Sequence, residues 1–197
     1  MADTKISAMT NASTLTGSEF VPLVQSGANV KDTLSTVAAF CRGNAGAFSS
    51  TVTQTGSITA GTAFTFNSTD YAGGVTLASG SRITVPVAGT YNLQWSGQFD
   101  NPESNVEQVA VWIKVNGSDV PGSTGIITLP GRKNPATTGK LIVGWNFFLT
   151  MTASQYVEIY WLPAIATVTV PTYPASIAPA PVYPSTASVI ATMQQVA

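Results

Sequence analysis

The stretch of sequence that decides the fold runs from Arg82 to Phe99 and reads RITVPVAGTYNLQWSGQF. From Thr90 onward apolar and polar residues alternate. One face consists of Tyr91, Leu93, Trp95, Gly97 and Phe99, and the other of Thr90, Asn92, Gln94, Ser96 and Gln98. A period of two predicts a β-strand whose faces meet different surroundings. The polar face carries amides and hydroxyls but no charge, and we expect further strands to pack around this one.

Strand patterns recur at regular spacing over residues 51–197, with turns of Gly, Pro and Asn between them. The expected strands include Thr51–Ile58, Val109–Val115, Leu141–Met151, Tyr156–Leu162 and Ser188–Val196. Asn116-Gly117 is typical of a tight hairpin turn, and Asp70–Gly74 is expected to be a loop. With little helix indicated, the pattern predicts an all-β jelly roll or related β-sandwich.

Residues 1–40 differ from the rest and are too short to form an independent core. An apolar run at Phe20–Val24, a turn and a return strand at Asn29–Asp32 predict a hairpin. Thr33 or Ser35 is placed to cap a short helix that follows it. Residues 41–50 have the composition of a linker. We therefore expect a small N-terminal segment that lies against another surface, then a linker, then the jelly-roll head.

The composition excludes several classes of partner. Charged residues make up 9% of the 197 residues, against about 25% in ordinary soluble domains. The net charge is −1 and no basic run is present, which argues against nucleic acid as a partner. No apolar run follows Lys5, so no signal peptide is expected, and no run is long enough to predict a membrane span. An uncharged polar surface suits packing against other copies or a larger assembly.

The residue types needed for common catalytic sites are largely missing. The chain has no histidine and one cysteine, Cys41, which excludes a Ser/His/Asp triad and a Cys/His dyad. A pair of carboxylates, as in a polysaccharide depolymerase, is still open, with candidates Asp100, Glu103, Glu107, Asp119 and Glu158. The loop Asp100–Glu107 offers oxygen atoms to calcium, but a polar turn explains it better. We expect no enzymatic activity, no metal and no cofactor.

Several strands are apolar on both faces, and a β-sandwich has only one inner face per sheet. The second face is therefore covered either by the Pro-rich segment 163–184 or by another subunit, and we expect a homo-oligomer. The segment 163–184 is too apolar for a free linker, so it is expected to pack on the domain or on a neighbour. The expected oligomer interface consists of Trp112, Phe148, Tyr160, Tyr173 and Tyr183.

Residues 4–35, TKISAMTNASTLTGSEFVPLVQSGANVKDTLS, resemble a short N-terminal module of tailed-phage fibre, spike and head-decoration proteins. The resemblance lies in Lys5-Ile6-Ser7, Leu15-Thr16-Gly17-Ser18-Glu19, Val21–Val24 and Thr33-Leu34-Ser35. It implies attachment at the particle-proximal end of the protein. The virion-anchoring residues implied are Ile6, Leu15, Phe20, Val21, Leu23, Val24 and Val30.

Residues 51–197 resemble the jelly roll of tumour necrosis factor and of complement globular heads. The resemblance lies in Ile83–Tyr91, in the hairpin Val111–Gly117, and in Leu149–Ile159, where Ala153-Ser154-Gln155 replaces the usual Ala-Gly-Asp. The Pro-rich insertion before the closing strand is a further departure. The resemblance implies a homotrimer with aromatic faces toward the three-fold axis.

Together these features predict a virion protein assembled in the host cytoplasm: a trimeric capsid decoration protein or short head fibre that contacts the major capsid or another virion protein through its N-terminus. The alternative is a tail fibre or tip adhesin that binds a host surface glycan. In that case the candidate receptor contacts are Asp100, Asn101, Glu103, Arg132 and Lys133, in two polar loops.

Overall fold

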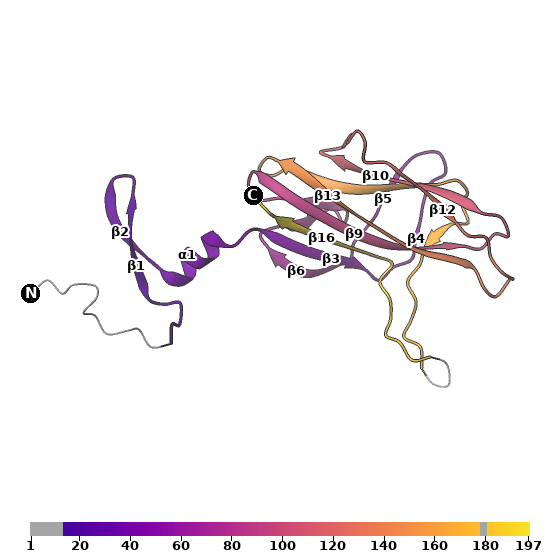
Figure 1. Cartoon of the computed structure of the whole chain (residues 1–197), viewed down its shortest axis with the longest axis horizontal. Coiled ribbons are helices and arrows are strands. Elements are labelled where there is room, and N and C mark those ends of the chain that lie inside the picture. Colours follow the sequence, from indigo (N-terminus) through magenta and orange to yellow (C-terminus); the bar gives the residue numbers. More distant parts are fainter. Residues whose placement is uncertain (1–13, 178–180) are drawn as a thin grey trace, which may run out of the picture. The chain divides into compact units, whose positions relative to one another are not determined.

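The computed structural model describes residues 14–177 and 181–197 and divides the chain into two units, Met1–Gly43 and Asn44–Ala197 (Figure 1). We call the first the N-terminal unit and the second the head. None of the helices in the described part of the chain is long and apolar enough to cross a membrane.

The N-terminal unit contains a hairpin followed by a short helix. Its elements are β1 (Phe20–Gln25), β2 (Ala28–Thr33) and α1 (Leu34–Cys41). The two strands pair antiparallel, and the turn residues Ser26 and Gly27 both have positive φ. The hydroxyl of Thr33 accepts a hydrogen bond from the amide of Thr36 at 3.2 Å, so Thr33 caps the helix as the sequence indicates.

The head is built from two antiparallel sheets. One, the β9 sheet, has the order β4-β15-β9-β16-β3-β6, and β13 also pairs with β9 along its whole length. Its strands are β3 (Ala45–Ser50), β4 (Gln54–Thr55), β6 (Ser68–Gly73), β9 (Gly89–Asn101), β13 (Gly139–Met151), β15 (Thr169–Val170) and β16 (Val189–Gln195).

The other sheet, the β14 sheet, has the order β11-β10-β14-β8-β7, with β12 beside β10 and β5 beside β14. Its strands are β5 (Thr62–Ala63), β7 (Thr76–Ala78), β8 (Arg82–Thr84), β10 (Glu107–Val115), β11 (Ser118–Asp119), β12 (Gly125–Leu129) and β14 (Tyr156–Pro163). The turn between β10 and β11 is the predicted one, since Asn116 and Gly117 both have positive φ.

The chain crosses repeatedly between the sheets, so neighbours within a sheet come from distant parts of the sequence. β8 precedes β9, β12 precedes β13 and β13 precedes β14, and each step changes sheet. β16 lies between β3 and β9. This is the strand order of a jelly roll, and the predicted all-β fold class is confirmed.

The core lies between the two sheets and is rich in aromatic side chains. The ring of Phe64 stacks on Trp161 of β14 at a centroid distance of 5.7 Å and lies 5.8 Å from Trp95 of β9. Residues 91, 93, 95, 97 and 99 of β9 are all buried. The apolar residues that alternate from Tyr91 to Phe99 therefore form the inner face of the central strand of the β9 sheet.

The prediction of a linker over residues 41–50 is wrong for residues 45–50. These residues form β3, which pairs with both β16 and β6. Small residues are needed because the backbone lies close to the core. A Cβ atom on the buried Gly46 would lie 2.8 Å from the Phe48 ring and 3.1 Å from Val75. Composition alone made these residues look like a linker.

Two further strand assignments differ from the structure. The expected loop Asp70–Gly74 lies mostly within β6, a strand at the sheet edge that is largely exposed and so lacks an alternating pattern. The expected strand Thr51–Ile58 is reduced to β4. There the side-chain amide of Gln54 exchanges two hydrogen bonds of 2.9 Å with the backbone of Thr65, in place of a longer ladder.

The Pro-rich segment packs on the head only at its ends. Residues 171–177 and 181–187, which we call the arm, leave the sandwich after β15, project from it, and return to β16 (Figure 1). At the root, the amide of Thr172 donates to the Thr53 hydroxyl at 3.2 Å and Tyr173 pairs with Thr186. The expectation that the segment packs on the domain is thus met by its root, whereas the outer part extends away.

Candidate functional site

The outer face of the β9 sheet combines aliphatic side chains with amides. Its central outward residues are Asn92, Gln94, Ser96 and Gln98 of β9, Ile142, Gly144, Asn146 and Phe148 of β13, and Ile190, Thr192 and Gln194 of β16. None of these residues is charged. Phe148 is 65% exposed, and Ile142 and Ile190 are exposed as well. Covering such a face costs less desolvation than covering charged groups, provided that its amides and hydroxyls find hydrogen-bond partners.

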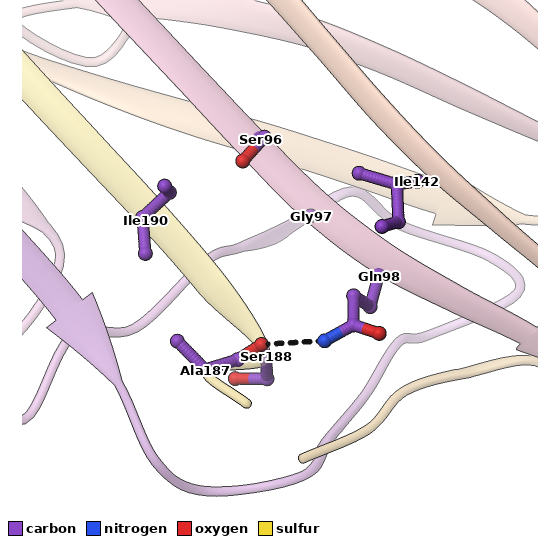
Figure 2. A pocket seen from close by; sticks show the side chains of 7 residues that line it. All are labelled: Ser96, Gly97, Gln98, Ile142, Ala187, Ser188 and Ile190. Carbon is purple, nitrogen blue, oxygen red and sulfur yellow. Dashed lines mark hydrogen bonds between the residues drawn. The ribbon is translucent and has the colours of Figure 1, made fainter. Parts of the chain in front are cut away.

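This face is hollowed where the arm returns to the sheet. The hollow has a volume of about 180 Å³ and is lined by Ser96, Gly97, Gln98, Ile142, Ala187, Ser188 and Ile190. Figure 2 shows Ile142 and Ile190 on the two sides of Gly97, with the Gln98 amide hydrogen-bonded to the Ala187 carbonyl at 3.0 Å. Gly97 contributes only backbone atoms to the floor of the hollow, because a Cβ atom there would point to the core, 3.8 Å from Phe64. The hollow therefore presents two aliphatic walls and a satisfied amide.

A second hollow of about 320 Å³ adjoins the first and shares Gln98 and Ile142 with it. At its edge, the ammonium of Lys140 donates to the Tyr173 hydroxyl at 2.6 Å, and that hydroxyl donates to Oδ2 of Asp100 at 2.8 Å. The ammonium also lies 3.9 Å from the centre of the Tyr173 ring and 3.8 Å from the Asp100 carboxylate. This cluster fixes the arm root to β9 and β13.

The surroundings of the cluster shift two of its pKa values. Burial raises the pKa of Tyr173, and the hydrogen bond to Asp100 acts in the same direction. For Lys140 burial alone lowers the pKa, but the hydrogen bond to Tyr173 and the charge of Asp100 outweigh it, so the pKa is raised. Both groups are thus held in their protonated forms.

Around Trp112 and Tyr160 the outer face of the β14 sheet is covered by its own chain. Trp112 and Tyr160 lie there, 5.8 Å apart, and both are half-buried. The Trp112 indole donates to Asp119 at 2.7 Å, and Lys114 lies 3.3 Å from the same carboxylate and 4.6 Å from the centre of the Tyr160 ring. A Cβ atom on Gly61 would lie 2.3 Å from Trp112, so the loop before β5 lies directly on the indole.

The expected interface residues therefore do not form one patch. Trp112 and Tyr160 lie on the outer face of one sheet, and Phe148 on that of the other. Tyr173 is committed to the arm root, and Tyr183 lies farther out on the arm, 48% exposed. The sequence indicated the two-faced strands but contained no signal of the Gly61 loop that covers one of them.

The two loops expected to contact a receptor lie side by side. The amide of Arg132 donates to the carbonyl of Glu103 at 2.7 Å, and Arg132 and Lys133 are exposed while Glu103 is half-buried. Asn101, however, is fully buried, and its side-chain amide donates to the carbonyls of Asn105 and Pro130. Its assignment as a receptor contact is therefore wrong, because the amide holds the loops together.

Asp100 differs from the expectation in a similar way. Its side chain is largely buried against Tyr173 and Lys140, so it serves the arm root. Among the described residues no group of three or more Asp, Glu, Cys or His side chains is placed to hold a metal ion. Of the candidate carboxylates, Glu158 is buried and accepts a hydrogen bond from Ser81 at 2.6 Å, with Arg82 at 3.7 Å.

The expected anchoring residues lie mainly on the hairpin of the N-terminal unit. Phe20 is 63% exposed and Val24 74% exposed, Leu15 and Leu23 are exposed, and Val21 and Val30 are half-buried. Ile6 lies outside the described residues. Next to the hairpin, the Glu19 carboxylate accepts hydrogen bonds from Thr16 and Gly17, which lower its pKa to about 2.

Comparison with known proteins gives no family for this chain and does not carry the fold assignment. No protein-family model matches the sequence, and no curated protein matches it either. Among solved structures, the chain is similar to the globular domain of a zebrafish complement 1qA protein. The TM-score is 0.45 at 11% identity, over 79% of this chain and 98% of that chain. We base the jelly-roll assignment on the strand order of the two sheets.

Proposed function

We propose that this chain is a structural virion protein of a tailed phage, without catalytic activity, that attaches through its N-terminal unit and displays the jelly-roll head as a homotrimer. Its place is that of a capsid decoration protein or short head fibre. The proposal joins the resemblance of residues 4–35 to phage attachment modules with the geometry of the unit that contains most of them.

The observation that carries the proposal is the hairpin β1–β2, whose apolar side chains are exposed. Phe20 and Val24 lie on one face of a two-stranded ribbon, which is too small to bury them by itself. Exposed apolar residues on a separate small unit are typical of a docking element. The major capsid protein or another virion protein is the partner that the resemblance implies.

Trimer formation is supported by the uncharged outer face of the β9 sheet. Phe148, Ile142 and Ile190 are exposed there among amides and hydroxyls. A soluble head normally places charged residues on such a face, and this face has none at its centre. Copies of the same chain are an uncharged partner of the required kind.

The second candidate function is that of a tail fibre or tip adhesin for a host surface glycan. It is favoured by the adjacent loops 100–107 and 131–139, which expose Arg132 and Lys133 at one place on the head. A glycan array distinguishes the two functions, because an adhesin gives a signal that the double variant Arg132→Ala, Lys133→Ala loses.

The location of the protein on intact virions tests the proposal directly. Imaging of particles labelled through the head is expected to show label over the capsid. Label confined to the tail would favour the adhesin, and unlabelled particles would overturn both. With the full chain, Phe20→Asp combined with Val24→Asp is expected to reduce incorporation into particles at least about tenfold, whereas the exposed control Gln25→Asp leaves it unchanged.

A further inference from the structure

The arm is a preformed hairpin that extends from the head. At its root, Tyr173 and Thr186 exchange hydrogen bonds of 2.9 Å, and farther out the amide of Ser176 donates to the Tyr183 carbonyl at 3.0 Å. Proline fixes φ at several points along it, which stiffens a segment of this length. The arm therefore presents its outer residues in a defined geometry.

The outer residues of the arm are apolar and exposed. Ile177 is 79% exposed and Val182 75% exposed, and Tyr183 lies next to them. The arm has no charged residue, and none occurs anywhere between Ile159 and Ala197. A projecting segment that stays in solvent is normally polar or charged. Apolar side chains held out on a stiff hairpin instead indicate a surface that receives them.

The hollow on the outer face of the β9 sheet matches these side chains in size and chemistry. Its walls are Ile142 and Ile190, its volume is about 180 Å³, and no charged residue lines it. The amide of Gln98 already donates to the Ala187 carbonyl, so an aliphatic side chain entering the hollow does not strip that donor of its partner. The hollow and the exposed side chains of Ile177 and Val182 are thus complementary in size and chemistry.

The arm of the same copy does not reach this hollow. Ala187 and Ser188 line the hollow at the arm root, and Val182 is five residues farther out, about 16 Å along an extended chain. The root is held by the bonds of Thr172 and Tyr173 to the head. The pairing of Tyr173 with Thr186 and of Ser176 with Tyr183 keeps the arm extended away from its own hollow, so we assign the occupant to another molecule.

We propose that the arm of one copy seats Ile177 and Val182 in the Ile142–Ile190 hollow of a neighbouring copy. Each copy then gives one arm and receives one, a head-to-tail contact that closes into a ring such as a trimer. The inference rests on the proposed association of copies and names the contact that joins them.

Disulfide trapping tests the contact. In the full chain with Cys41→Ser, Val182→Cys is paired with Ile142→Cys or with Ile190→Cys. Oxidation is expected to give covalent oligomers on a non-reducing gel, because seated residues lie within disulfide range. The control pairs Val182→Cys with Val87→Cys, an exposed residue before β9 that lines neither hollow on the β9 face, and is expected to stay uncrosslinked. Absence of crosslinks from both hollow positions, or crosslinking equal to the control, overturns the contact.

Analytical ultracentrifugation separates failure of the contact from failure of the trimer. Ile177→Asp combined with Val182→Asp is expected to raise the dissociation constant of the oligomer about 100-fold, because each variant carboxylate has no partner in the hollow. Val87→Asp, at an exposed position before β9, is the control and leaves the dissociation constant unchanged. An oligomer unaffected by the arm variant overturns the arm contact alone. A wild-type chain that is monomeric at micromolar concentration overturns the arm contact and the trimer together.

Discussion

The two outer faces of the head look alike in sequence but differ in the folded chain. Both belong to strands with large apolar residues on each side, with Trp112 and Tyr160 on one face and Phe148 on the other. On the β14 sheet the chain covers its own aromatics with the Gly61 loop, Asp119 and Lys114. On the β9 sheet it leaves Phe148 exposed. An apolar outer face thus indicates a missing partner only where no loop of the same chain supplies the cover.

The largest difference between the faces is expected in the stability of the fold. Trp112→Ala removes an indole packed between Tyr160 and the Gly61 loop, and should lower the free energy of unfolding by about 2–3 kcal/mol. Chemical denaturation at several protein concentrations is the measurement. Phe148→Ala, the matched change on the β9 face, should alter the melting temperature only where copies associate. If both variants lost the same free energy of unfolding at low protein concentration, the two faces would not differ in how the chain covers them.

Association is expected to show the opposite pattern. Phe148→Asp places a charge on the uncharged face of the β9 sheet and should raise the dissociation constant of the oligomer about 30-fold, or about 2 kcal/mol. Sedimentation measures the change. Gln108→Asp, an exposed position on the β14 face, serves as the control. An oligomer that tolerates Phe148→Asp but not the control would assign the interface to the other sheet.

A smaller effect is expected where the β14 face buries a charge. Ser81→Ala removes the hydroxyl that donates to the buried carboxylate of Glu158 at 2.6 Å. Hydrogen bonds to charged groups contribute about 1.5 kcal/mol or more, so the free energy of unfolding should fall by about that amount. Thr150→Ala, on the exposed face of β13, should change it by less than about 0.5 kcal/mol. No loss in Ser81→Ala would mean that Arg82 alone satisfies the carboxylate.

The smallest effect concerns pH at the arm root, beside the β9 face. The pKa values of Lys140 and Tyr173 are both raised in the folded chain. The contribution of these two groups to the free energy of unfolding is therefore complete at a pH below their ordinary pKa values, about 10. It is lost as the pH rises through their raised pKa values in the folded chain. Absorbance of tyrosinate in the wild type minus that in Tyr173→Phe should titrate above pH 10. A midpoint below that value would contradict the geometry of the cluster.

Much of the fold was predictable because it rests on local patterns. The alternation from Tyr91 to Phe99 and the dipeptide Asn116-Gly117 are signals contained in a few adjacent residues, and the structure confirms both. Strand β3 was not predictable, since its small residues are explained only by Phe48 and Val75, which lie over Gly46. Its place in the sheet depends on β16, far along the chain.

The candidate surfaces were less predictable, because exposure depends on contacts distant in sequence. The sequence around Asn101 predicts a polar loop residue, but its side chain is buried and its amide donates hydrogen bonds to two backbone carbonyls. Trp112 and Phe148 are equally prominent in the sequence, and only the Gly61 loop separates a covered residue from an exposed one. Loop position, which decides these cases, has no short-range signal.

The position of β16 between β3 and β9 has a consequence for synthesis of the chain. Until Val189–Gln195 has emerged from the ribosome, the facing edges of β3 and β9 have unpaired backbone groups and the core lacks Met193 and Val189. Open edges of this kind promote pairing with other chains. Because β16 closes this gap, the head acquires its full set of sheet contacts only after Val189–Gln195 has been synthesised. Contacts between finished heads therefore form after that point.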